Sequence, residues 1–307
     1  MPELRRVATY RSMRAAGASR RSIENHVGTP DVTALRRGAW TITGESASVR
    51  QHQLDLLAGS QFLSPDTVFS HVTAAALHDL PLPPVGTEQL WVTQPRYGGG
   101  HRRDRLITIG RILPPEHILD DGVRRFTSVE RTVVDMASEF GFETGLMVAD
   151  AALRAGADAS VLADVVKTCG RPRGLGHARQ VVAMADGCAE SPAESLIRAK
   201  WHIAGVPAPI LQLVVRDSKG RFLGRVDFAW PEAGVIAEYD GRTKYGALLE
   251  PGDDIGQVII AEKRREAAII DKGWTVLRFT VKDLRTPTGS AQRILAALAR
   301  PSRRRIA

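Results

Sequence analysis

The sequence predicts a multidomain protein of mixed α+β or α/β structure. Its 307 residues, 43% of them hydrophobic and 25% charged, are more than one core usually needs and fit two or three domains. Stretches with apolar residues at helical spacing alternate with short strand-like runs, and glycine and proline separate them. We expect domains over residues 1–50, 51–188 and 189–300, followed by a basic tail over residues 301–307.

The chain is basic, with 42 Lys and Arg against 34 Asp and Glu and a net charge of +8. Residues 1–50 contain nine arginines and four acidic residues, and Arg300, Arg303, Arg304 and Arg305 lie near the other end. A positive surface attracts polyanions, so double-stranded DNA is the expected partner. The alternative for each of these stretches is a charge run that is only solvated.

Features of secreted and membrane proteins are missing from the sequence. The N-terminal stretch MPELRRVATYRSMRAAG has no apolar core of a signal peptide, and no window approaches about 20 apolar residues. Cys169 and Cys188 have no Cys or His at zinc-finger spacing, which predicts neither a structural zinc nor a disulfide framework. We therefore expect a soluble, cytoplasmic protein without membrane contact, and the sequence does not indicate its oligomeric state.

The first 45 residues predict three short helices and a strand. Apolar residues at helical spacing suggest a helix over residues 3–16, Ser19 caps a second helix that ends near Val27, and Thr29 with Pro30 opens a third helix up to Arg37. The strand covers residues 39–42. This order, with its basic surplus, is typical of a winged helix-turn-helix whose third helix enters the major groove.

In that arrangement four residues are candidate DNA contacts. Thr33 and Arg36 on the third helix would meet base edges, whereas Arg37 and Arg20 would bind phosphates. The alternative is a three-helix subdomain that only packs on its neighbour.

The stretch from about residue 64 to residue 186 mixes helices with a few strands and reads as a scaffold. Thr127 and Glu130 form a capping box that starts a helix, and a second helix covers residues 143–154. His71 and His78 lie on one helix face without a third ligand, so we expect them to be packing residues.

Three segments, TALRRGAW, SHVTAAALHDLPLP and FTSVERTVVDMA, resemble AbiEi-type antitoxins and related actinobacterial regulators. This resemblance implies a DNA-binding regulator and a possible cognate toxin as partner.

The C-terminal segment predicts a helix, a three-stranded antiparallel meander, a second helix and a fourth strand. Ser191 and Pro192 open the first helix, which ends near Ala204. The strands cover residues 210–217, 222–230 and 235–240. The second helix covers residues 257–272, and residues 274–279 add a strand to the sheet.

The turn over residues 231–234 sets the register of the second and third strands. If Trp230 pairs with Val235, then Asp227 lies opposite Glu238 on one face of the sheet. Carboxylates on opposed residues, with Cβ atoms about 4.5–5.5 Å apart, repel unless a cation lies between them. The spacing therefore predicts a site for Mg²⁺ or Mn²⁺, which prefer oxygen ligands and activate water.

The C-terminal motifs resemble the Vsr-like branch of the PD-(D/E)XK nucleases. They are Asp227, the run Glu238-Tyr-Asp-Gly241, the run Glu262-Lys-Arg-Arg265, and the run Gly273-Trp-Thr-Val-Leu-Arg278. The resemblance implies a restriction-endonuclease-like fold that hydrolyses DNA with Mg²⁺ or Mn²⁺. It assigns Asp227 and Glu238 to the metal, Glu194 to an acid on the leading helix, and Gln212 to a polar position of the first strand.

The chain departs from the superfamily pattern at Asp240, where Glu-x-Lys is expected. The lysine that stabilises the developing negative charge is therefore missing from the strand, and Lys244, Lys263 and Arg264 are the candidates to replace it, with Lys263 first. Arg264 is also a candidate DNA contact. Asp240 is either a further metal ligand or the partner of Arg225 in a cross-strand ion pair.

Three functions are compatible with these patterns, and the third is a structural or toxin-binding adaptor, which needs a separately encoded partner. The first is a DNA-binding, metal-dependent endonuclease. The second is a non-catalytic DNA-binding regulator or type IV antitoxin whose nuclease fold has lost its activity.

Overall fold

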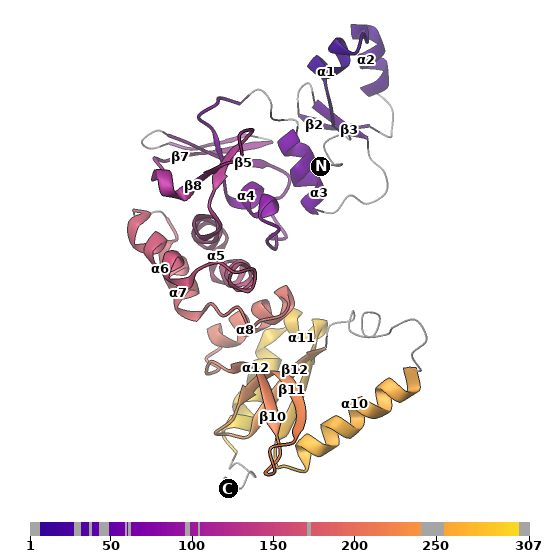
Figure 1. Cartoon of the computed structure of the whole chain (residues 1–307), viewed down its shortest axis with the longest axis vertical. Coiled ribbons are helices and arrows are strands. Elements are labelled where there is room, and N and C mark those ends of the chain that lie inside the picture. Colours follow the sequence, from indigo (N-terminus) through magenta and orange to yellow (C-terminus); the bar gives the residue numbers. More distant parts are fainter. Residues whose placement is uncertain are drawn as a thin grey trace. The chain divides into compact units, whose positions relative to one another are not determined.

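The structure is a computed structural model that describes residues 7–27, 32–36, 39–42, 49–58, 60, 63–95, 99–103, 105–170, 173–240 and 255–300. The chain divides into two compact units, residues 1–184 and 185–307. Both units mix helices with sheets, which confirms the predicted α+β multidomain class. Figure 1 shows the elements of each unit.

The first unit begins with two short helices beside a three-stranded antiparallel sheet. The elements are β1 (Val7–Thr9), α1 (Tyr10–Ala15), α2 (Arg20–Val27), β2 (Val32–Arg36) and β3 (Ala39–Ile42), and β3 is the central strand. Thr9 and Ser12 form a capping box at the start of α1. The Oγ of Ser19 accepts a hydrogen bond from Ser22 N at 3.1 Å, as the predicted cap of the second helix requires.

The predicted third helix over residues 29–37 is wrong, because residues 32–36 form strand β2 and pair with β3. Val32 and Thr33 are β-branched and favour a strand, and pairing along β3 outweighs the weak helical signal of the proline. Thr33 and Arg36 therefore lie on a strand rather than on a recognition helix, and Arg37 lies outside the described residues. The first helix is also shorter than predicted, because residues 7–9 pair with β3 as β1.

The rest of the first unit is a six-stranded mixed sheet with helices. The strand order is β6-β7-β5-β4-β9-β8. The strands are β4 (Val68–Phe69), β5 (Leu90–Gln94), β6 (His101–Arg103), β7 (Leu106–Gly110), β8 (Ile118–Asp120) and β9 (Arg125–Thr127), and the helices are α3 (Val49–Ala58), α4 (His71–Leu77), the 3-10 turn η2 (Pro115–His117), α5 (Val129–Arg154), α6 (Ala159–Thr168) and α7 (Leu175–Met184).

Helix α5 joins the two helices that the sequence predicts over its length. Gly141, with φ 85°, breaks the helical geometry between them. The helix starts one residue later than predicted, because Ser128 rather than Thr127 is the N-cap and accepts the hydrogen bond from Arg131 N.

The second unit has the predicted order of helix, three strands, helix and strand. Its elements are α8 (Pro192–Ile203), β10 (Ile210–Arg216), β11 (Phe222–Trp230), β12 (Val235–Asp240), α10 (Ile255–Ile270), β13 (Thr275–Thr280), α11 (Val281–Arg285) and α12 (Pro287–Leu298). Strands β10, β11 and β12 form the predicted antiparallel meander, and β13 pairs with β12 in parallel. Trp230 pairs with Val235, as the turn over residues 231–234 predicts.

Helices cover both faces of this sheet. On one face Trp201 of α8 packs edge-on against Phe228 and Phe279 and donates a hydrogen bond to Ser290 Oγ at 2.9 Å. Ile294 of α12 joins the same core. On the other face Ile269 of α10 packs with apolar residues of the strands and with Trp274. Figure 1 shows α8, α12 and α10 around β10, β11 and β12.

Candidate functional site

The acids that the sequence selects come from three neighbouring elements of the second unit. Glu194 lies in the first turn of α8 and is buried, with 4% of its surface exposed. Asp227 lies on β11 and is 9% exposed, and Glu238 lies on β12. Gln212 lies on the edge strand β10. Of these elements, α8, β10 and β11 bring the side chains of Glu194, Gln212 and Asp227 together.

Gln212 lies between two of the acids. Its Nε2 is 3.4 Å from Glu194 Oε2 and 3.5 Å from Asp227 Oδ1. Both distances are long for an N–H···O bond, which usually measures about 2.7–3.2 Å. One amide group therefore faces two carboxylates and holds neither of them tightly.

The pleat of both strands is interrupted at this point. Leu211 packs in the core beside α8, but Leu213, two residues further, packs against the core beside α10. Val226 and Phe228 are divided in the same way between the two cores. Gln212 has φ 50°, a left-handed conformation that is uncommon for a residue other than glycine. This irregularity brings Gln212 toward the acids.

Glu194 also completes the N-terminal cap of α8. Its Oε1 accepts a hydrogen bond from Ser191 Oγ at 2.8 Å, and its Oε2 accepts one from Glu190 N at 3.0 Å. Ser191 Oγ in turn accepts a hydrogen bond from Glu194 N at 3.2 Å. A carboxylate in this position stabilises the first turn of a helix. Helix capping thus fixes Glu194 next to Gln212.

Asp227 bridges β11 and β12 through its side chain. Its Oδ2 accepts a hydrogen bond from Tyr239 N at 2.9 Å. The pairing of β11 with β12 ends at Phe228 and Ala237, so the position of Asp227 opposite Glu238 stays a prediction. Oδ1 is directed to Gln212 instead, so the two oxygens of Asp227 face different groups.

Two arginines bind Glu238. Arg265 of α10 places Nη2 3.0 Å from Glu238 Oε1, and Arg278 of β13 places Nε 3.8 Å from Glu238 Oε2. Arg278 Nη2 also contacts Glu266 Oε2 at 3.0 Å. The sequence motifs contained both arginines, but no spacing rule related either of them to Glu238.

The candidates for the missing lysine lie elsewhere. Lys263 and Arg264 are exposed on α10, and Lys244 lies outside the described residues. Asp240 ends β12, where it pairs along the backbone with Thr280 of β13. Arg225 is paired with Glu190 at 2.8 Å instead of with Asp240.

The side chains of Glu194, Gln212 and Asp227 carry oxygen atoms, the kind of ligand that a hard divalent cation prefers. Within the described ranges no group of three His, Cys, Asp or Glu side chains is close enough to hold a metal. Glu194 and Asp227 nevertheless converge on the Gln212 amide, and that amide turned by 180° would present Oε1 with the two carboxylates. Three oxygens from two acids and one amide are ligands that Mg²⁺ and Mn²⁺ accept.

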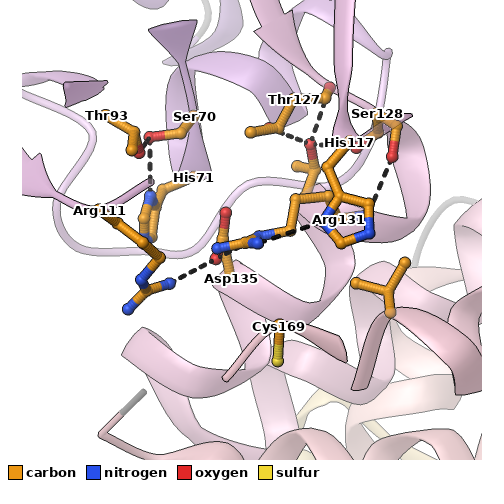
Figure 2. Close-up of polar contacts among 12 residues, drawn as sticks. Ser70, His71, Thr93, Arg111, His117, Thr127, Ser128, Arg131, Asp135 and Cys169 are labelled. Atoms are coloured by element: carbon orange, nitrogen blue, oxygen red, sulfur yellow. Dashed lines mark hydrogen bonds and ion pairs between the residues drawn. The ribbon is translucent and has the colours of Figure 1, made fainter. Parts of the chain in front are cut away.

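A second polar cluster lies buried in the first unit, where the sequence predicted only a scaffold (Figure 2). Arg131 and Asp135, one turn apart on α5, are each 1% exposed, and Arg131 Nε lies 3.0 Å from Asp135 Oδ1. Arg111 reaches the same oxygen at 3.3 Å. Arg131 Nη1 is 3.4 Å from His117 Nδ1. Arg131 and Asp135 lie four residues apart on an apolar helix, and this spacing is the sequence feature from which the ion pair could have been predicted.

His71 belongs to the same cluster and is buried, as expected for a packing residue. Its Nδ1 lies 2.9 Å from Ser70 Oγ, and its ring stacks on Trp91 at 5.1 Å. His78 is also a packing residue, with Nε2 2.7 Å from Thr127 O. Residues 70–83 and 126–137 thus supply part of a buried polar network.

Burial sets the ionisation of this cluster. It lowers the pKa of His71 and of His117 because the imidazolium form loses its hydration. For Asp135, burial raises the pKa, but the charges of Arg131 and Arg111 and the hydrogen bond from Arg131 outweigh burial and hold the pKa below its usual value. The folded first unit therefore favours the neutral forms of His71 and His117 and the ionised form of Asp135.

We expect the first unit to lose stability on acidification from about pH 7.5 to about pH 5.5. The unfolded chain, in which histidine has its ordinary pKa of 6.5, then binds protons that folded His71 and His117 do not bind. The histidine contribution is fully present above about pH 6.5 and is lost as the pH falls below it. Hydrogen exchange at the amides of α5, corrected for the intrinsic rate, measures this. Protection that is unchanged or higher at the lower pH would contradict the expectation.

His71→Asn is the matched variant, because asparagine tolerates the φ of 50° at this position. It should make the protection less dependent on pH, since one of the two buried imidazoles is absent.

Comparisons with known proteins give sequence relatives without a stated activity. No family model matches the chain. Relatives include the Uncharacterized protein MT2308 of Mycobacterium tuberculosis (strain CDC 1551 / Oshkosh) and the Uncharacterized protein Rv2248 of Mycobacterium tuberculosis (strain ATCC 25618 / H37Rv). Each is 33% identical over 179 residues, which cover 58% of this chain and 61% of the relative.

No helix in the described part of the chain is long and apolar enough to cross a membrane.

Proposed function

We propose that the protein binds double-stranded DNA and that its second unit is a metal-dependent endonuclease domain of the PD-(D/E)XK type. The observation that carries the proposal is the convergence of Glu194 and Asp227 on the Gln212 amide. The order of α8, the β10–β12 meander, α10 and β13 supports it, because this is the order expected of that fold. Glu238 lies on the next strand, within the same sheet.

In this proposal Asp227, Glu194 and Gln212 would hold Mg²⁺ or Mn²⁺, with Glu238 and Asp240 as the further acids of the predicted set. A bound divalent ion would supply Lewis acidity to the phosphate and lower the pKa of the attacking water. Neighbouring groups of the chain hold these carboxylates in position. Tyr239 N fixes the Asp227 carboxylate, and the cap of α8 fixes Glu194.

DNA affinity is assigned to the first 42 residues as a winged helix-turn-helix. With residues 32–36 in a strand, α1 and α2 become the helix pair and the β2–β3 hairpin becomes the wing. Helix α2 exposes Arg20, Arg21, Ser22 and Asn25, whereas Ile23 is buried. Arginine, serine and asparagine side chains donate to phosphates and base edges. Helix α2 therefore replaces residues 29–37 as the proposed recognition helix.

A non-catalytic DNA-binding regulator, such as a type IV antitoxin with a cognate toxin, is the second candidate. Two observations favour it. Asp240 stands where the superfamily pattern has lysine. Glu238 is bound by two arginines, whose positive charges compete with a metal for the carboxylate.

Nicking of supercoiled plasmid separates the two candidates. The endonuclease proposal predicts cleavage with Mg²⁺ or Mn²⁺, loss of cleavage with a chelator, and loss with Asp227→Ala or Glu238→Ala. Absence of cleavage across substrates and metals would favour the regulator. Cleavage that persists in both variants would point to a contaminating nuclease.

The same protein tests DNA binding by α2. Arg20→Ala combined with Arg21→Ala should weaken binding to duplex DNA and reduce the salt dependence by about two phosphate contacts. Arg179→Ala, an exposed arginine of α7 in the same unit, is the control. Equal binding by both variants and the unchanged protein would remove α2 from the interface.

A further inference from the structure

We propose that the outer side of strand β10 binds a second copy of this chain, whose own β10 pairs with it in antiparallel orientation. Strand β10 ends the order β10-β11-β12-β13, and among the described residues no strand pairs with its outer side. The peptide N–H and C=O groups on the outer side of an edge strand can pair with a strand of another chain. This association does not depend on the proposed function, because it involves neither DNA nor metal.

Large apolar side chains are exposed along this edge of the sheet. Ile210 is 51% exposed and Val214 43% exposed, and Phe222 of β11, which pairs with Arg216, is 61% exposed. Single exposed apolar residues are ordinary on a protein surface, but three of them gather here on one strand and the start of the next. Soluble proteins commonly protect an edge strand with charged side chains, especially lysine. In β10 Arg216 is the one charged residue, and it lies at the end of the strand.

The charge of β10 favours a second copy over other partners. A nucleic acid binds several cations, and a charged peptide binds a row of opposite charges, whereas this strand offers one cation. In an antiparallel pair of two copies centred on Leu213, each Arg216 lies opposite Ile210 of the other copy, and the two arginines lie at opposite ends. Like charges are thus kept apart, and the apolar residues of the two strands come together. The same surface serves both copies, as a twofold interface requires.

An irregularity at Gln212 limits the size of this contact. The register of β10 with β11 passes from the pair Leu211–Phe228 to the pair Leu213–Val226 and skips Gln212, which has φ 50°. A kinked edge strand forms a shorter continuous ladder with a partner strand. A stable interface buries about 1,600 Å² in total, and one kinked strand with its neighbouring side chains buries less. We therefore expect a dimer that forms reversibly, with a dissociation constant on the order of micromolar.

The pairing would place the candidate sites of the two copies close to their common interface. Gln212 is part of β10, and its Nε2 lies 3.4 Å from Glu194 Oε2 and 3.5 Å from Asp227 Oδ1. The two four-stranded sheets would become one continuous sheet. Each copy would thus contribute one Gln212 near the twofold axis.

Sedimentation velocity of the full chain, without DNA or metal, tests the proposal at concentrations from about 1 to about 100 µM. The average mass should rise from near 33.4 kDa toward twice that value as the concentration increases. Val214→Lys should weaken the association by about tenfold or more, because a lysine on an edge strand opposes pairing. Ile270→Lys is the matched control, because Ile270 of α10 is 49% exposed in the same unit, and it should leave the association unchanged.

Hydrogen exchange of the unchanged protein locates the contact without any variant. The amides of β10 should exchange more slowly at high than at low protein concentration, whereas those of β13, at the other edge of the sheet, should not change. A chain that stays monomeric up to about 100 µM overturns the proposal. It is also overturned by a dimer that is as stable in Val214→Lys as in Ile270→Lys, or by a dimer whose β10 amides gain no protection.

Discussion

Asp135→Asn is expected to destabilise the first unit by about 3–5 kcal/mol. The substitution keeps the shape of the side chain but removes the negative charge that Arg131 and Arg111 share. Arg131 is 1% exposed and would remain charged without a counter-ion. An uncompensated charge in a buried site costs far more than the net value of the ion pair itself.

Calorimetry of the full chain measures this effect as a midpoint lower by roughly 10 °C or more. Asp164→Asn is the matched control, because it removes an ion pair with Lys167 on α6 whose side chains are 68% and 72% exposed. Exposed pairs contribute about 0–1 kcal/mol. Similar midpoints for the two variants would mean that the Arg131–Asp135 pair does not stabilise the unit.

Asp227→Asn is expected to lower the rate of DNA cleavage by about 10²–10³-fold, the effect of losing several kcal/mol of charge stabilisation. The asparagine can still accept the hydrogen bond from Tyr239 N, so the strands stay paired. What it loses is the charge beside Gln212 and Glu194.

Single-turnover cleavage of a labelled duplex checks this expectation. Asp271→Asn, at an exposed position just after α10, is the control in the same unit. A variant at Asp227 that cuts as fast as the control would exclude Asp227 from the reaction.

The fold of the second unit was predictable because local signals set its register. Pro231 and Gly234 limit the turn, and Gly234 N donates to Pro231 O at 3.1 Å, which fixes Trp230 opposite Val235. Counting from that pair predicts Asp227 opposite Glu238, one step beyond Phe228 and Ala237, where the pairing of the two strands ends. The caps of α8 were also readable, because Ser191, Pro192 and Glu194 follow the usual N-terminal pattern.

Contacts between distant segments were not predictable in the same way. Arg265 reaches Glu238 only because α10 packs on β11 above Gly224. No periodic pattern in the sequence predicts this packing. The Gln212 side chain approaches the acids through a left-handed backbone, which its residue type does not suggest. These features depend on how the whole unit packs.

The first unit shows where local signals conflict. Thr29 and Pro30 resemble the start of a helix, yet Val32 and Thr33 pair with β3. Hydrogen bonding along a neighbouring strand is a tertiary effect that overrides helix propensity. The burial of Arg131 and Asp135 was hidden for a similar reason, because an arginine and an aspartate one turn apart usually form a surface pair.

Titration of the full chain with Mn²⁺, followed by calorimetry, tests most directly whether Glu194, Gln212 and Asp227 form a metal site. The proposed site predicts binding of about one Mn²⁺ per chain that Asp227→Asn weakens strongly and Asp271→Asn leaves unchanged. Binding that is absent from the unchanged protein, or equally strong in Asp227→Asn, would contradict it.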